Sequence, residues 1–131
     1  MKETDTLIKL RLNLASSAPS TIDQKVAQRS AYNFIYGIAL FCFLRDNKVI
    51  QVEKQTHLKK IDKIKFLLQY LQEHYPEIYC VDLPDYDLDD YTLRFEEEPL
   101  LKTAQEVFKL VRKIKYNDFW STFEEFFIAS F

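Results

Sequence analysis

An uncharged run of eleven residues, 34–44 (FIYGIALFCFL), constrains the fold more than any other part of this sequence. The chain as a whole is 29% charged, and the run contains its single glycine, Gly37. Side chains of these types are mostly buried in folded proteins, so the run must lie in the interior. The longest uncharged span around it, residues 30–44, is shorter than the ~20 apolar residues of a membrane-spanning helix. We therefore expect a water-soluble protein whose other elements cover this run.

Gly37 decides how the run is divided. A glycine that follows a helical pattern most simply ends the helix, because glycine adopts the left-handed conformation without a Cβ clash. We therefore predict a helix that ends near Tyr36 and a strand over residues 38–44. The polar residues 46–47 form a turn, and the alternating residues 48–54 complete a β-hairpin.

A second interpretation treats residues 21–44 as one continuous helix. Gly37 would then lie in a helix interior, at a cost of about 1 kcal/mol relative to alanine. The protein would in that case be mostly helical with a small sheet. We favour the hairpin.

The remaining elements before residue 83 support a mixed fold. Residues 7–14 alternate apolar and polar side chains, which is the period of a half-buried strand. Residues 57–75 repeat apolar side chains at helical spacing and end at Pro76. The short apolar segment 77–83 is typical of an interior strand. The order strand, helix, strand, strand, helix, strand over residues 7–82 is that of a ferredoxin-like βαββαβ sandwich, an α+β fold.

The C-terminal part is expected to extend this core. We predict an acidic loop and a strand over residues 83–98, then a pair of helices over residues 99–131. The first of these helices has a regular apolar stripe, formed by Leu100, Ala104, Val107, Val111 and Ile114. With 131 residues and 47% hydrophobic content, the chain is of the usual size for one domain, residues 1–131, with a core that needs no disulfide or metal.

Composition excludes several broad classes. The formal net charge is −2, so there is no overall bias toward nucleic acid or acidic membranes. Cys42 and Cys80 lie in apolar surroundings and are interpreted as buried small hydrophobes. Together with a charged N-terminus that does not resemble a secretory leader, they indicate a cytoplasmic protein.

The sequence offers little for catalysis. The two histidines, His57 and His74, lie at opposite ends of one predicted helix, ~25 Å apart at 1.5 Å per residue. There is no glycine-rich phosphate loop and no nucleophile or metalloprotease motif. We therefore expect a protein that is not an enzyme and has no catalytic residue, metal or cofactor.

The acidic stretch 82–98 is the first candidate contact surface. Its carboxylates partly match the spacing of a calcium-binding EF-hand loop, but Asp90 stands where that loop requires glycine, so we expect no calcium site. Aspartates interleaved with tyrosines suit a basic partner, because tyrosine anchors interfaces while charge steers encounter. The predicted partner-binding residues are Asp85, Tyr86, Asp87, Asp89, Asp90 and Tyr91.

A second stripe on the predicted helix 57–75 combines cations with aromatic rings. It consists of Lys59, Lys63, Phe66 and Tyr70, followed by His74. Such a stripe could stack bases and hold phosphates, or it could receive another helix, of which the C-terminal one is a candidate. Helix docking is the interpretation we favour.

The aromatic C-terminal helix is the third candidate. Its rings could cover the second face of the predicted sheet or form an interface between subunits. The candidate oligomer residues are Phe119, Trp120, Phe123 and Phe127.

These features favour a small non-enzymatic protein-binding module of the inhibitor, immunity or antitoxin type. It would present the acidic, tyrosine-containing surface to a basic site on a partner protein and would not engage membranes. One alternative is a nucleic-acid-binding module that uses the lysine and aromatic helix face. The other is a structural subunit of a homo-oligomer.

Overall fold

The structure is a computed structural model that describes residues 2–50, 61–79 and 95–130. These residues form a bundle of helices, α1 (Lys2–Ser16), α2 (Gln24–Asp46), α3 (Ile61–His74), α5 (Glu97–Val111) and α6 (Phe119–Ser130), with a short 3-10 turn η1 (Tyr116–Asp118) before α6. No strand occurs within the described ranges. The predicted ferredoxin-like α+β sandwich is therefore wrong, and the fold is a helical bundle.

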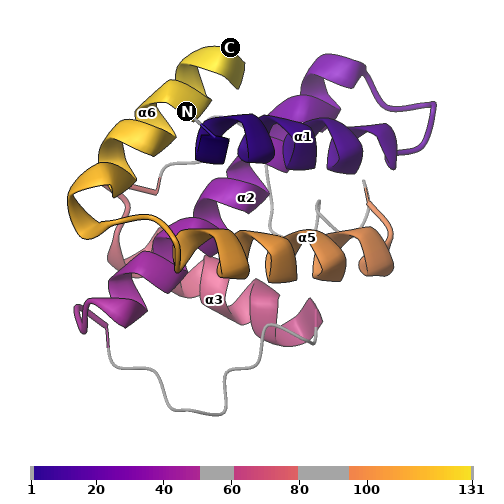
Figure 1. The fold of residues 1–131 in the computed structure, drawn as a ribbon. Coiled ribbons are helices and arrows are strands. Elements are labelled where there is room, and N and C mark those ends of the chain that lie inside the picture. The colour runs from indigo at the N-terminus through magenta and orange to yellow at the C-terminus, as the bar shows by residue number, and fades with distance from the viewer. Residues whose placement is uncertain (1, 51–60, 80–94, 131) are drawn as a thin grey trace.

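Helix α2 is the centre of the bundle, and Figure 1 shows α1, α3, α5 and α6 arranged around it. Every residue from Ser30 to Leu44 except Tyr36 is buried. A helix that is apolar on all sides is stable only when other elements cover all of its sides. The uncharged run is therefore the middle of a central helix, and the predicted strand 38–44 and its hairpin are wrong for this reason.

Gly37 lies inside α2 and does not end it. A Cβ atom at this position would meet Leu68 Cδ2 and would come within 2.8 Å of the Tyr79 hydroxyl and 2.9 Å of its Cζ atom. The glycine is needed because α3 and the Tyr79 ring pack directly on the α2 backbone. The interpretation with a continuous helix over residues 21–44 comes closer to α2, although its small sheet is absent from the described ranges.

The polar turn expected after the run does exist, but it is the end of α2. Asn47 is the C-cap, and Lys48 follows with a positive φ of 60°. Lys48 N donates to Arg45 O over 3.0 Å and Val49 N donates to Leu44 O over 2.9 Å, which is the Schellman pattern of a helix end. A lysine occupies the left-handed position that glycine usually takes.

The predicted strand 7–14 is part of α1. The buried residues of α1 are spaced three or four apart, as on one side of a helix. They are Thr4, Leu7, Arg11, Leu14 and Ala15. Leu12, which strand alternation would bury, is 46% exposed. Of the four alternating apolar residues, Leu14 is buried, Ile8 and Leu10 are partly buried and Leu12 is exposed, as expected when a helix turns them to different sides.

Three of the predicted helices are confirmed. Helix α3 lies within residues 57–75 and buries Ile64, Leu68 and Leu71, with Leu67 in addition. Helix α5 buries four of the five predicted stripe positions, and the fifth, Ile114, lies beyond its end and is partly buried. Helix α6 occupies the predicted C-terminal position. For the predicted strand 77–83, only residues 77–79 lie in the described part, and they belong to a turn region after α3.

Candidate functional site

The contact between α2 and α6 is built from paired aromatic rings. Three pairs run along it in antiparallel order, with ring centroids 5.0 Å apart for Tyr32 and Phe126, 5.8 Å for Tyr36 and Phe123, and 4.0 Å for Phe43 and Phe119. We call these three pairs the aromatic ladder. Ring pairs at such distances contribute about 0.5–1.5 kcal/mol each beyond the area that they bury.

The large apolar residues of α6 fall on two adjacent sides of the helix. Phe119, Phe123 and Phe126 are buried in the ladder. Trp120, Phe127 and Ile128 lie on the solvent side beside it, with exposed fractions of 45%, 48% and 67%. Large apolar side chains that gather on one exposed face mark an interaction surface more often than a solvated one.

We define the α6 outer face as five residues that recur at helical spacing on the solvent side, Tyr116, Trp120, Glu124, Phe127 and Ile128. Positions 120, 124, 127 and 128 follow the i, i+4, i+7, i+8 pattern of one helix side. Tyr116 precedes them by one further turn and belongs to η1. The face is therefore a continuous ridge.

Rings of the ladder hold the rings of the outer face in place. The Tyr116 ring stacks on Phe43 with centroids 5.4 Å apart, and the Trp120 ring meets the same Phe43 edge-on at 5.7 Å. The Phe127 ring packs edge-on against Tyr32 at 5.8 Å. Side chains fixed in this way lose little conformational entropy when a partner covers them.

The electrostatic character of this face is acidic. Helix α6 contains two glutamates and no lysine or arginine. The carboxylate of Glu125 accepts a hydrogen bond from the Thr4 hydroxyl over 3.0 Å and so joins α6 to α1. Glu124 lies on the exposed face between Trp120 and Ile128. Any partner that covers the apolar ridge must also meet this carboxylate.

A cation lies behind the C-terminal end of α6. Arg11 of α1 is buried, and its Nη1 donates to the Ala129 carbonyl over 3.3 Å. Burial lowers the pKa of the Arg11 guanidinium, which nevertheless stays charged because arginine does not deprotonate in proteins. A cation beside the last carbonyls of a helix stabilises the helix through its dipole.

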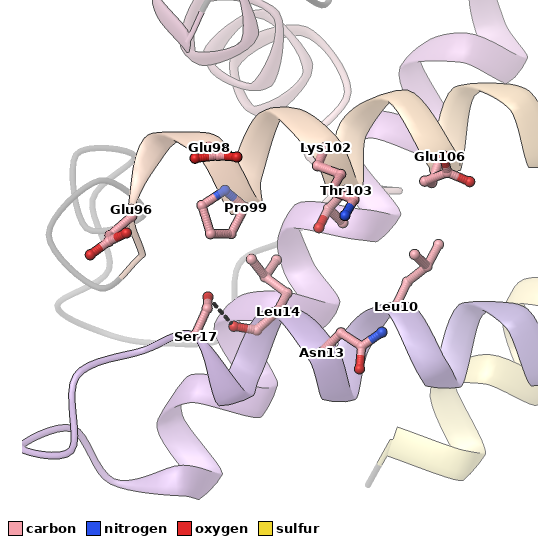
Figure 2. A pocket seen from close by; sticks show the side chains of 10 residues that line it. All are labelled: Leu10, Asn13, Leu14, Ser17, Glu96, Glu98, Pro99, Lys102, Thr103 and Glu106. Atoms are coloured by element: carbon pink, nitrogen blue, oxygen red, sulfur yellow. Dashed lines mark hydrogen bonds between the residues drawn. The ribbon is translucent and has the colours of Figure 1, made fainter.

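A pocket of about 350 Å³ lies between α1 and α5. Figure 2 shows it bounded by Leu10 and Leu14 on one side and by Pro99, Lys102 and Thr103 on the other. Its carboxylates, on Glu96, Glu98 and Glu106, are exposed. Acidic residues at the start of α5 are accounted for by the helix dipole.

The hydroxyl of Ser17, which lines the pocket, donates to the Leu14 carbonyl over 2.6 Å. Among the described residues that line the pocket there is no histidine or cysteine. The Ser17 hydroxyl is therefore bound to a backbone carbonyl and not to a base that would activate it.

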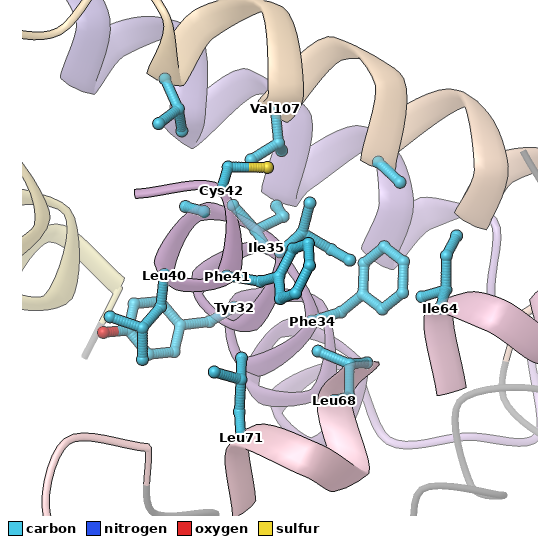
Figure 3. Packing of buried hydrophobic residues seen from close by; sticks show 14 of the residues in the cluster. Tyr32, Phe34, Ile35, Leu40, Phe41, Cys42, Ile64, Leu68, Leu71 and Val107 are labelled. Carbon is cyan, nitrogen blue, oxygen red and sulfur yellow. The ribbon is translucent and has the colours of Figure 1, made fainter. Parts of the chain in front are cut away.

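Cys42 is a core residue, as the sequence predicted. Figure 3 shows its sulfur pointing toward Val107 of α5. Burial raises the pKa of the Cys42 thiol to about 12, so the nucleophilic thiolate is scarce at neutral pH. In the part of the chain that the structure describes, no three histidine, cysteine, aspartate or glutamate side chains gather where they could hold a metal ion.

The predicted acidic contact surface lies outside the described residues. This applies to Asp85, Tyr86, Asp87, Asp89, Asp90 and Tyr91, and also to Lys59. Of the same acidic stretch, Glu97 and Glu98 are described, and they occupy the first turn of α5.

On α3, the residues of the predicted lysine and aromatic stripe differ in their exposure to solvent. Phe66 is 63% exposed, while Lys63 and Tyr70 are partly buried. The Tyr70 ring lies against His74 with centroids 4.3 Å apart. Helix α6 packs on α1 and α2, and helix docking on this stripe stays a prediction.

The four residues predicted for an oligomer interface fall into a buried pair and an exposed pair. Phe119 and Phe123 belong to the internal ladder, whereas Trp120 and Phe127 lie on the outer face. The sequence interpretation missed Tyr116, Glu124 and Ile128. Placing the helix at 100° per residue would have separated the two sets, because residues 119, 123 and 126 share one side and residues 120, 124 and 127 another.

Comparison of the chain with known protein families, curated proteins and solved structures finds no match. Among the described residues, no helix is both long and apolar enough to cross a membrane.

Proposed function

We propose that this chain is a small non-enzymatic protein-binding module, of the inhibitor, immunity or antitoxin type, whose partner has a basic site. The observation that carries the proposal is the α6 outer face, where Trp120, Phe127 and Ile128 are 45–67% exposed on one side of a helix. Tryptophan and other aromatic residues are enriched among the side chains that dominate binding energy at protein interfaces.

Charge supports a basic partner. Glu124 lies within the apolar ridge, and α6 has no cation of its own. The sequence contains a further acidic segment, formed by Asp85, Asp87, Asp89 and Asp90 and interleaved with Tyr86 and Tyr91. Complementary charge speeds encounter and fixes orientation, while the aromatic anchors supply affinity. A cytoplasmic location belongs to this proposal, and the buried, unpaired Cys42 is what supports it.

The proposal is tested by comparative capture from a lysate of the source cells. The native chain is immobilised beside two variants, Trp120→Ala with Phe127→Ala, and a neutralised acidic segment with Asp85, Asp87, Asp89 and Asp90 changed to Asn. We expect at least one protein that the native chain retains and one or both variants lose, with binding that weakens as salt rises. Identical retention by the native chain and both variants would contradict it.

A nucleic-acid-binding module is the second candidate, and the exposure of Phe66 on α3 is the observation that favours it. An exposed ring can stack a base in a sequence-tolerant way. Titration with a labelled single-stranded oligonucleotide at low ionic strength tests it. Binding that weakens steeply with salt and is lost in Phe66→Ala supports this candidate. Absence of binding at low ionic strength excludes it.

A further inference from the structure

We propose that the α6 outer face is a docking site for one amphipathic helix of a partner protein, with aliphatic side chains against Trp120 and Phe127 and a lysine or arginine opposite Glu124. The inference rests on the proposed protein-binding function and names the kind of partner.

The shape of the face indicates a helical partner. Its apolar residues form a ridge along α6, and helices pack by fitting such ridges into the grooves of a neighbour. From Tyr116 to Ile128 the ridge is about 18 Å long at 1.5 Å per residue. A partner helix of three to four turns, roughly 12–14 residues, spans this length and presents anchors at i, i+3 or i+4, and i+7.

The exposed rings of the α6 outer face are also preorganised for binding by contacts with the core. Trp120 and Tyr116 both contact the Phe43 ring, and Phe127 contacts Tyr32. Phe43 and Tyr32 are themselves buried and belong to the aromatic ladder. The exposed rings therefore occupy fixed positions before the partner arrives, which reduces the entropy lost on association.

The position of Glu124 argues against a second copy of this chain as the occupant. Two copies packed antiparallel with their α6 helices crossing at position 124, midway between residues 120 and 128, would bring Glu124 against Glu124 of the other copy. Like charges facing each other across a desolvated interface cost several kcal/mol. A cationic side chain at the same place gives a charge-assisted contact instead.

The test uses the whole chain and two designed peptides of about 18 residues, longer than the ~12–15 residues below which isolated helices are marginal in water. One contains leucine at i, i+3, i+4 and i+7, lysine at the positions that flank this stripe and alanine elsewhere, and the matched peptide has glutamate in place of every lysine. Trp120 is the only tryptophan in the chain, so its fluorescence reports burial of this face directly. We expect a blue shift that saturates with the lysine peptide and none with the glutamate peptide.

Three variants test whether the peptides bind at the α6 outer face. Phe127→Ala should weaken the lysine peptide by about 30-fold, the effect of removing a dominant interface residue. Glu124→Lys should reverse the preference, so that the glutamate peptide binds and the lysine peptide does not. Phe66→Ala is the matched control, because Phe66 is at least as exposed but lies on α3, and it should change affinity less than twofold. Thermal unfolding of each variant confirms that the bundle is intact.

Four results would overturn the inference, three of them with the purified chain. The first is equal binding, or no binding, of the two peptides. The second is affinity that Phe127→Ala leaves unchanged. The third is sedimentation of the native chain as a dimer at micromolar concentration that Phe127→Ala dissociates, which assigns the face to a second copy.

The lysate experiment separates this inference from the proposed function. If a captured partner still binds both Phe127→Ala and Glu124→Lys, this site is rejected and the protein-binding function stands. Capture of no partner rejects the function itself.

Discussion

The central helix α2 makes two contacts of opposite kind, one with α3 and one with α6. On the α3 side, Gly37 has no side chain and the partner atoms of Leu68 and Tyr79 lie directly on the helix backbone. On the α6 side, large rings fill the space between the helices as the aromatic ladder. In the first contact the helices approach closely because a side chain is absent, whereas in the second the space between the helices is filled by large rings.

The two contacts also differ in what lies exposed around them. Leu68 and Tyr79 are both buried where they meet Gly37, and the hydroxyl of Tyr79 donates to the Asn33 carbonyl over 3.4 Å. Around the ladder, by contrast, Tyr116, Trp120 and Phe127 contact buried rings and are still exposed. A contact built from large rings leaves ring surface that a further partner can cover.

The largest expected effect comes from removing one ring of the ladder. Phe123→Ala should lower the free energy of unfolding by about 3–5 kcal/mol, because the buried ring leaves a cavity. Chemical denaturation measures this loss. Phe127→Ala, one turn further along the same helix, is the control and should lose less than half as much. Equal losses would show that the two faces of α6 are not energetically distinct.

Filling the space at Gly37 tests the α3 contact. Gly37→Ala should destabilise the fold by about 1–3 kcal/mol, since the added methyl group overpacks the contact with Leu68 and Tyr79. At an exposed position the same change would stabilise a helix by about 1 kcal/mol. The sign of the change in unfolding free energy therefore decides between a close contact and a loose one.

A double variant sharpens this test. Leu68→Ala removes the atom nearest to the added methyl group, so Gly37→Ala should destabilise a Leu68→Ala background less than it destabilises the native chain. Additive effects would show that the methyl group does not meet Leu68.

The end of α2 offers a stabilising change that bears on both contacts, since both depend on this helix. Lys48→Gly should raise the free energy of unfolding by up to about 1 kcal/mol, because glycine adopts the left-handed conformation without steric cost. Asn47→Gly is the matched control. Asn47 has an ordinary φ of −96° and its Nδ2 donates to the Phe43 carbonyl over 2.8 Å. That variant should lose stability, and a gain there equal to that of Lys48→Gly would argue against the helix-end explanation.

The smallest expected effect on stability lies on the α6 outer face. Trp120→Ala should change the free energy of unfolding by less than about 1 kcal/mol, because the side chain is 45% exposed and most substitutions at such positions have small effects. Thermal denaturation followed by circular dichroism measures this without a tryptophan signal. A loss as large as that of Phe123→Ala would show that Trp120 serves the fold and would weaken its assignment to binding.

Much of the helical content was predictable from periodicity. Helices α3, α5 and α6 each repeat apolar residues at a spacing that only a helix brings to one side. The same rule, applied at 100° per residue, would have separated Phe123 from Trp120 and so located the outer face. The acidic segment 85–91 stays a prediction, because it lies outside the described residues.

The sequence by itself determined that the run 34–44 lies largely in the interior and that helices occupy the regions of α3, α5 and α6. It could not determine whether that run is a helix or a strand, because a segment apolar on every side has no period to read. The tertiary structure decided this through neighbours distant in sequence. Leu68 and Tyr79 meet the α2 backbone at Gly37, and the ladder rings of α6 meet its other side. A lone glycine is compatible with a helix end or with close packing, and only the atoms that approach it distinguish the two.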